Sequence, residues 1–126
     1  MNDLYYQLSD AFKAEWPDKE YGSGVDHNGR LFHKFLLRRS PKRALKLELS
    51  EIGLRASYHI QGTGAFNNYM SGSPDMFPSV LIEKWDDDKY TLNTINGESM
   101  QVDCIESLQP LVIAQMKEAI LMGVNH

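Results

Sequence analysis

Residues 30–60 constrain the fold of this chain more than any other stretch. In the middle of this stretch every second residue is a leucine, at Leu45, Leu47 and Leu49, and the residues between them are charged. A second run with the same alternation covers residues 54–61. Because successive side chains of a β-strand point to opposite faces of the sheet, both runs predict strands with one buried face. Residues 31–38 carry apolar residues on both faces, which is typical of a central strand.

Residues 40–53 also carry signals that favour a helix. Ser40 is a good N-cap, Pro41 suits the first helical position, and Gly53 is a common terminator. In such a helix, however, the three alternating leucines would lie on different sides. We therefore predict a strand here and keep the helix as the alternative.

An amphipathic helix is predicted at the start of the chain. Asn2 or Asp3 can cap it, and Pro17 ends it, because the residue before a proline is pushed out of the helical region. Its apolar residues recur at helical spacing: Leu4, Leu8, Ala11 and Phe12. Residues 17–30 are polar and rich in glycine, and we expect them to form an irregular connection.

The middle of the chain carries less regular signal. Residues 62–79 form a long loop with several aromatic and methionine side chains, and long loops inside compact domains are often functional. This loop either folds over a sheet edge or presents those side chains to a partner. Residues 80–85 predict a further strand, and the three aspartates at 86–88 predict a turn.

The Asn-Gly pair at 96–97 is the strongest hairpin signal in the chain. A two-residue loop would mix polar and apolar residues on both faces of the hairpin. A three-residue loop with Gly97 in the left-handed conformation instead pairs Leu92 with Met100 and Tyr90 with Val102. We predict this second register, which leaves one polar, solvated sheet face.

A last helix, capped by Ser107, is apolar over more than half of its circumference. One sheet face cannot bury so wide a surface, so the first helix or a second copy of the chain must cover the rest. The sequence predicts a single α+β domain over residues 1–126. It consists of an antiparallel sheet of five or six strands, flanked by an N-terminal and a C-terminal helix on one face.

Basic residues concentrate in the strand-rich centre of the chain. Residues 30–55 hold eight of the thirteen Lys and Arg residues and only two acidic residues, which gives a net charge of +6. The remaining residues carry −10, so the net charge of the whole chain is −4. An uneven distribution of this kind steers charged partners, although charges that merely keep a sheet edge soluble give the same pattern.

No cofactor, metal or catalytic motif is present in the sequence. Gly62 and Gly64 lack the third glycine of a dinucleotide site, and the histidines are scattered. We place His33 and His59 on neighbouring strands, where they could meet, and expect Cys104 to be buried on the apolar side of the hairpin. We therefore expect a protein that is not an enzyme and needs no cofactor or metal.

The remaining features favour a small cytoplasmic protein-binding module of bacterial type. Its most concrete form is an immunity-type inhibitor that binds and neutralises a basic toxin domain, and a secretion-effector chaperone is the alternative. A lone cysteine, no signal peptide and no apolar run of membrane-spanning length fit the cytoplasm. The contact residues expected are acidic and aromatic: Phe66, Tyr69, Asp75, Phe77, Glu83, Asp86, Asp87 and Asp88.

Two further possibilities concern other surfaces. The basic hairpin could bind nucleic acid or phosphate through Arg38, Arg39, Lys42 and Arg43, although the negative net charge disfavours a dedicated nucleic-acid protein. The wide apolar surface of the last helix could form a homodimer, and its candidate residues are Leu111, Ile113, Met116, Ile120, Leu121 and Met122.

Overall fold

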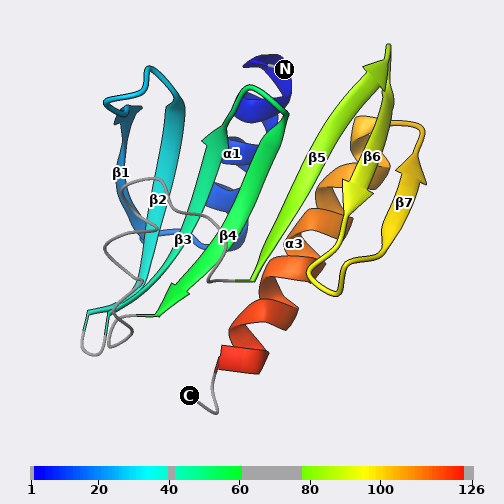
Figure 1. Ribbon diagram of the computed structural model, residues 1–126. Coiled ribbons are helices and arrows are strands. Elements are labelled where there is room, and N and C mark those ends of the chain that lie inside the picture. The colour runs from blue at the N-terminus through cyan, green and yellow to red at the C-terminus, as the bar shows by residue number, and fades with distance from the viewer. Residues whose placement is uncertain (1, 40–41, 61–77, 124–126) are drawn as a thin grey trace.

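The computed structural model describes residues 2–39, 42–60 and 78–123 of the chain (Figure 1). In these ranges seven strands form one antiparallel sheet, and their spatial order follows the chain from β1 to β7. The helices are α1 (Asn2–Glu15) and α3 (Ile105–Gly123). The strands are β1 (Glu20–Val25), β2 (Leu31–Arg39), β3 (Lys42–Leu49), β4 (Leu54–Ile60), β5 (Ser79–Asp86), β6 (Lys89–Asn93) and β7 (Ser99–Val102).

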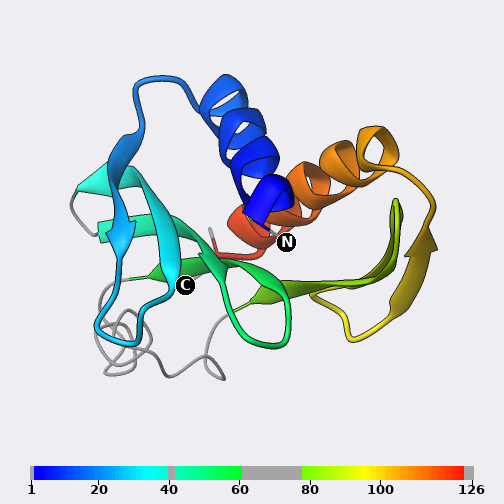
Figure 2. The same cartoon turned by 90° about the horizontal axis from the view of Figure 1, so that it is seen from above.

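Both helices lie on the same side of the sheet, which curves around them (Figure 2). We call the helix-covered side the inner face and the opposite side the outer face. The inner face of β2–β4 contributes Phe35, Leu45 and Tyr58 to the core, and α1 adds Leu8 and Phe12. The predicted α+β class, with both helices on one face, is confirmed.

The strand prediction for residues 40–53 is confirmed, and the alternative helix is absent from the described part of this stretch. In β3 the side chains of Leu45 and Leu47 are fully buried on the inner face. They lie opposite Tyr58 and Ala56 of β4. The burial of alternate leucines therefore outweighs the helix-start signals of the local sequence.

The predicted number of strands, five or six, was wrong, because the described residues form seven. The extra strand is β1, in the stretch that we predicted to be an irregular connection. All of its residues except Gly22 are exposed, so the sequence carries no alternating burial signal there. An edge strand that is hydrogen-bonded to only one neighbouring strand needs no apolar face. The alternation of apolar and polar residues therefore does not reveal such a strand.

The predicted register of the last hairpin is confirmed. Leu92 pairs with Met100 and Tyr90 with Val102. The amide of Gly97 donates to the Thr94 carbonyl (3.0 Å), and Gly97 has a φ of 84°, the left-handed conformation that the three-residue loop requires.

Helix α3 begins at Ile105, two residues before the predicted cap at Ser107. The Leu108 amide donates to the carbonyl of Cys104 (3.1 Å), so Cys104 is the residue that precedes the first turn. The inner stripe of the helix is fully buried: Leu108, Val112, Met116 and Ala119. No helix in the described residues is long and apolar enough to cross a membrane.

Helix α1 covers part of the remaining apolar surface of α3. Glu15 of α1 forms an ion pair with Lys117 of α3, and Ile113 is half-buried against the core. Leu121 and Met122, near the end of α3, stay largely exposed. Most of the apolar residues that we considered for a homodimer therefore belong to the core of one chain.

Candidate functional site

The outer face of β5–β7 is a polar surface organised around Trp85. The indole of Trp85 is 57% exposed, and its Nε1 donates to Oε1 of Gln101 (3.0 Å). Thr91 Oγ1 donates to the same oxygen (3.4 Å), and Lys89 Nζ lies 5.4 Å from the centre of the indole ring. The exposed ring is thus held by neighbours on two adjacent strands.

A second set of hydrogen bonds continues across the same face. Asn93 Nδ2 donates to Oε1 of Glu83 (3.2 Å), and Ser99 Oγ donates to Oδ1 of Asn93 (2.7 Å). These three residues come from three consecutive strands. Their side chains are fixed before any partner arrives, which lowers the entropy cost of binding.

The three aspartates at 86–88 form the tight turn at the end of this face. The Asp87 amide donates to Oδ1 of Asp86 (2.8 Å), and Asp88 has a φ of 56°. All three side chains are exposed, and residues 83–89 together carry four acidic and two basic groups. In the described residues, no group of three His, Cys, Asp or Glu side chains could hold a metal ion.

The structure brings together half of the predicted contact residues. Glu83, Asp86, Asp87 and Asp88 lie on or beside the outer face of β5–β7. The other four fall within 61–77, outside the described residues: Phe66, Tyr69, Asp75 and Phe77. Trp85 was missed by the sequence analysis, although its parity with Glu83 rather than with the buried Ile82 could have indicated an outward side chain. The register of β5 shifts at Trp85, and such irregularities re-aim a side chain.

The four predicted basic residues lie together at the β2–β3 end of the sheet, but on two faces. Arg38 is opposite Arg43, and Arg39 is opposite Lys42. Arg43 Nη1 donates to the Tyr58 hydroxyl (3.0 Å), whose ring lies in the inner core. The structure therefore divides the predicted nucleic-acid site between the inner and outer faces of the sheet.

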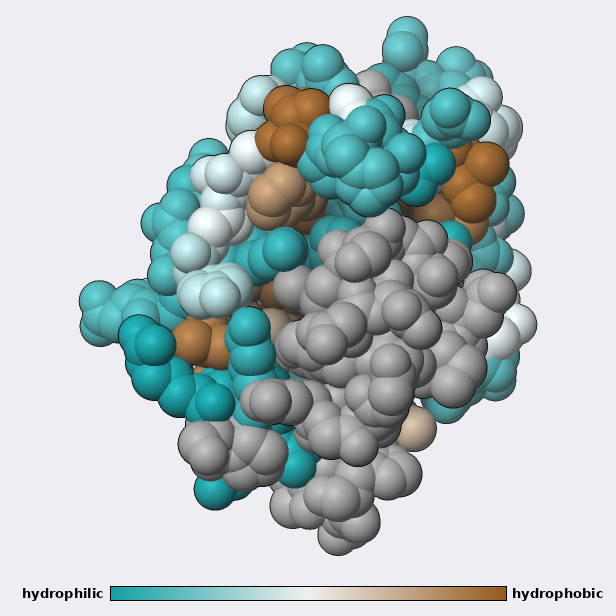
Figure 3. Space-filling view, turned by 60° about the vertical axis from the view of Figure 1, so that its left-hand side comes forward, coloured by the Kyte–Doolittle hydropathy of each residue, from teal (hydrophilic) through white to brown (hydrophobic). Residues whose placement is uncertain are grey.

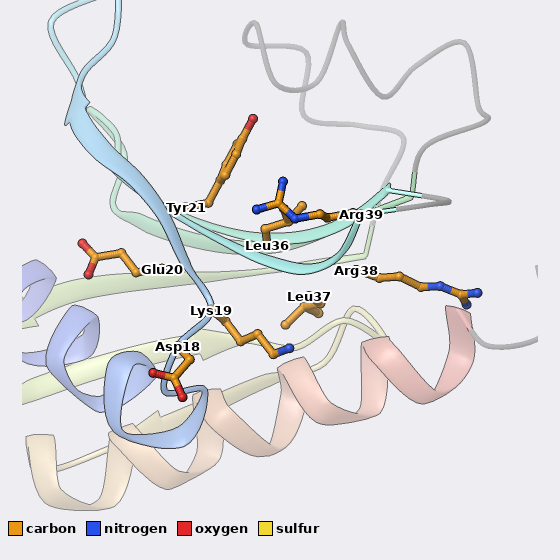
Figure 4. A pocket seen from close by; sticks show the side chains of 8 residues that line it. All are labelled: Asp18, Lys19, Glu20, Tyr21, Leu36, Leu37, Arg38 and Arg39. Carbon is orange, nitrogen blue, oxygen red and sulfur yellow. The ribbon is translucent and has the colours of Figure 1, made fainter.

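On the outer side, Lys42 Nζ donates to the Tyr21 hydroxyl (3.4 Å) and lies 5.0 Å from the ring centre. Figure 4 shows the Arg39 side chain pointing to the same side as Tyr21, while Arg38 points to the opposite side. A cavity of about 270 Å³ lies here. Its walls are Asp18, Lys19, Glu20, Tyr21, Leu36, Leu37, Arg38 and Arg39.

The outer face of β3 and β4 holds a buried polar cluster. Lys46 Nζ forms an ion pair with Glu48 Oε2 at 3.0 Å. Ser57 Oγ lies 3.1 Å from His59 Nε2. Burial, and secondarily the charges of Lys46 and Lys34, lower the pKa of His59 to about 3, so this histidine is neutral at physiological pH.

The prediction that His33 and His59 could meet was wrong. They lie on β2 and β4, with β3 between them, and they point to opposite faces. His33 Nε2 donates to Glu20 Oε1 (3.1 Å), and its ring stacks on Phe35 with a centroid distance of 4.7 Å. Burial lowers the pKa of His33 although Glu20 opposes the shift, so this histidine also stays neutral near pH 7.

Cys104 is half-buried in the connection between β7 and α3, and not part of the hairpin as we predicted. Its Sγ donates to Ser107 Oγ (3.2 Å). His33 and His59 lie on β2 and β4, away from this connection in the order of the sheet. The groups that we considered for catalysis thus lie on separate elements.

Comparison with protein-family models, with curated proteins and with solved structures finds no match to this chain.

Proposed function

We propose that this protein is a protein-binding module that uses the outer face of β5–β7 together with the turn at residues 86–88. The observation that carries the proposal is the exposed indole of Trp85 among side chains that already hydrogen-bond one another. Tryptophan is enriched among the residues that dominate binding energy at interfaces. A ring that needs no reordering binds without a large entropy cost.

The chemistry of this face supports a basic partner. Glu83 and the acidic residues at 86–88 flank Trp85 along β5 and the turn that follows, so they complement a surface rich in Lys and Arg. The concrete form that we propose is an immunity-type inhibitor that neutralises a basic toxin domain in the cytoplasm. A chaperone for a secreted effector is the alternative form of the same binding function.

Affinity capture with matched variants tests the proposal. Trp85→Ser should abolish the capture of a stoichiometric basic partner, whereas Tyr6→Ser, which removes an equally exposed aromatic ring from α1, should leave it intact. The captured protein, or the product of the neighbouring gene, is then assayed for toxic activity with and without this chain. Equal capture by both variants, or no partner at all, would contradict the proposal.

A second candidate function is anion binding at the β2–β3 end of the sheet. Arg38 lies opposite Arg43 and Arg39 opposite Lys42, and a concentration of positive charge of this kind attracts anions. Farther along β2, Lys34 Nζ lies 4.9 Å from the ring centre of Phe32, so a second cation on this strand is paired with an aromatic ring.

Fluorescence anisotropy with a labelled single-stranded RNA tests this second function. Binding should weaken as salt increases, and the double variant Arg39→Ala/Lys42→Ala should reduce the slope of log K against log salt by about 1.4. Lys117→Ala, on α3, is the control. A wild type without salt-dependent binding would exclude the function.

A further inference from the structure

Strand β1 has one unpaired edge. It pairs with β2 and with no other described strand, and it lies at the end of the sheet. An edge of this kind presents free N–H and C=O groups, to which another strand can add. In the view that brings the β1 side forward, the surface of the described residues is mostly hydrophilic, with a few hydrophobic areas (Figure 3).

The hydrogen-bond alternation identifies the groups that point outward. The Asp26 amide donates to the Arg30 carbonyl (2.9 Å) at the turn that joins β1 to β2. In an antiparallel pair, hydrogen-bonded and non-hydrogen-bonded positions alternate, so Gly24 bonds to β2 and its two neighbours do not. The N–H and C=O groups of Ser23 and Val25 therefore point to the open edge.

The register of β1 shifts between Glu20 and Gly22, which accounts for Gly22, whereas Gly24 lies in the regular part of the strand. Neither Gly22 nor Gly24 has a positive φ. A Cβ atom added to Gly22 would meet nothing within 4 Å, and at Gly24 it would lie 3.7 Å from the Phe32 ring, an ordinary contact. Glycine weakens a strand, and in a strand it often marks a place where another backbone approaches closely.

The edge also lacks the residues that usually prevent pairing. Residues 20–25 contain no lysine and no proline, and the one charged side chain, Glu20, is bound to His33. Tyr21 and Val25 are 49% and 60% exposed. The opposite edge, β7, is shorter by two residues and contains no glycine.

We propose that β1 pairs with β1 of a second copy of this chain about a two-fold axis at Gly24. In this register Ser23 of each copy faces Val25 of the other, and the two pairs form about four backbone hydrogen bonds. The two Gly24 residues form the close, non-hydrogen-bonded pair, with Cα atoms about 4.5 Å apart. The two seven-stranded sheets become one continuous sheet.

Charge supports a second copy as the occupant. The antiparallel arrangement opposes the two molecular charge distributions, because the basic β2–β3 end and the acidic turn at 86–88 lie at opposite ends of the strands (Figure 1). A two-fold dimer is the commonest closed assembly.

Sedimentation velocity on Ser23→Pro tests the proposal. Proline at this position removes an outward N–H and no hydrogen bond to β2, so the monomer should fold with an unchanged circular dichroism spectrum. The wild type should sediment at twice the chain mass at high micromolar concentration, and Ser23→Pro at the chain mass, with dimerisation at least about 100-fold weaker. Ser23→Ala, which keeps the N–H, should remain dimeric.

Two results would overturn the proposal. One is a wild type that stays monomeric at these concentrations. The other is a dimer that survives Ser23→Pro but dissociates on Leu121→Glu, since this would place the contact at the exposed end of α3 instead.

Discussion

The outer face of the sheet has two halves with the same alternating sequence pattern and opposite burial. On β3 and β4 the outward residues include Lys46, Ser57 and His59, each at most 3% exposed. On β6 and β7 the outward residues are also polar, but Ser99 and Gln101 are exposed, as is Trp85 of β5 beside them. Alternation therefore shows which residues share a face, and it does not show whether that face is solvated.

This difference in burial indicates that polar residues on β3 and β4 contribute to stability, whereas those on β5–β7 are available for binding. Charged groups buried on β3 and β4 need partners within the protein, and removing one partner leaves the other uncompensated. The exposed polar groups of β5–β7 exchange their contacts with water at little cost. Substitutions in the first half should therefore change the free energy of unfolding, and substitutions in the second half should change binding.

The largest effect is expected when the buried ion pair is broken. Glu48→Leu leaves the Lys46 ammonium buried without its carboxylate, which should cost about 3–5 kcal/mol of unfolding free energy in a urea titration. The double variant Lys46→Met/Glu48→Leu should recover most of this loss. Glu15→Leu, which breaks the more exposed pair with Lys117, should cost less than about 1 kcal/mol. Similar losses for the two single variants would show that the outer face is not a low-dielectric region.

The next effect concerns the junction between the two halves, where β4 meets β5. Gly53 has a φ of 154°, and a Cβ atom there would lie 2.3 Å from the Ile82 carbonyl oxygen. Gly53→Ala should therefore destabilise the fold by about 3 kcal/mol or more, through backbone strain and displacement of β5. Gly22→Ala, in open space, should change the unfolding free energy by less than about 0.5 kcal/mol. Thermal and urea unfolding of both variants measure the two changes in unfolding free energy. A loss at Gly53→Ala as small as that at Gly22→Ala would contradict the prediction.

A smaller effect is expected from acid. His59 binds a proton near its ordinary pKa of 6.5 in the unfolded chain and only near 3 in the folded one, so stability falls as the pH drops below 6.5. At about 1.4 kcal/mol per pH unit, the loss between pH 6.5 and 5 is about 2 kcal/mol. His33, whose pKa is also lowered, adds to the same trend.

The variant His59→Gln isolates this contribution, because glutamine does not titrate and His33 is unchanged. Its unfolding free energy should depend less on pH between 6.5 and 4 than that of the wild type. Parallel pH profiles would show that His59 is not shielded from protons in the folded state.

The smallest effect on stability is expected at Trp85. Its ring is 57% exposed, and its contacts with Gln101 and Lys89 are solvated. Trp85→Ser should therefore change the free energy of unfolding by less than about 1 kcal/mol, while it abolishes partner binding. A loss of 2 kcal/mol or more would make Trp85 a structural residue and weaken the proposed function.

The predicted site could be recovered only in part from the sequence. Charge composition indicated the acidic turn at 86–88 and the basic β2–β3 end, because each is contiguous in the chain. The ordered network around Trp85 joins residues from three strands, and no local pattern contains that information. The separation of His33 from His59 likewise depended on β3 lying between their strands.

The sequence by itself determined the elements in which burial repeats with a regular period. Alternating leucines specified β3, helical spacing specified α1, and Gly97 fixed the register of the last hairpin. The tertiary structure decided the elements and faces without a local signal. It placed the exposed β1 at the sheet edge and buried Lys46 and His59 on the outer face. The physical reason is that periodicity records which side chains share a face, whereas burial depends on what distant parts of the chain place against that face.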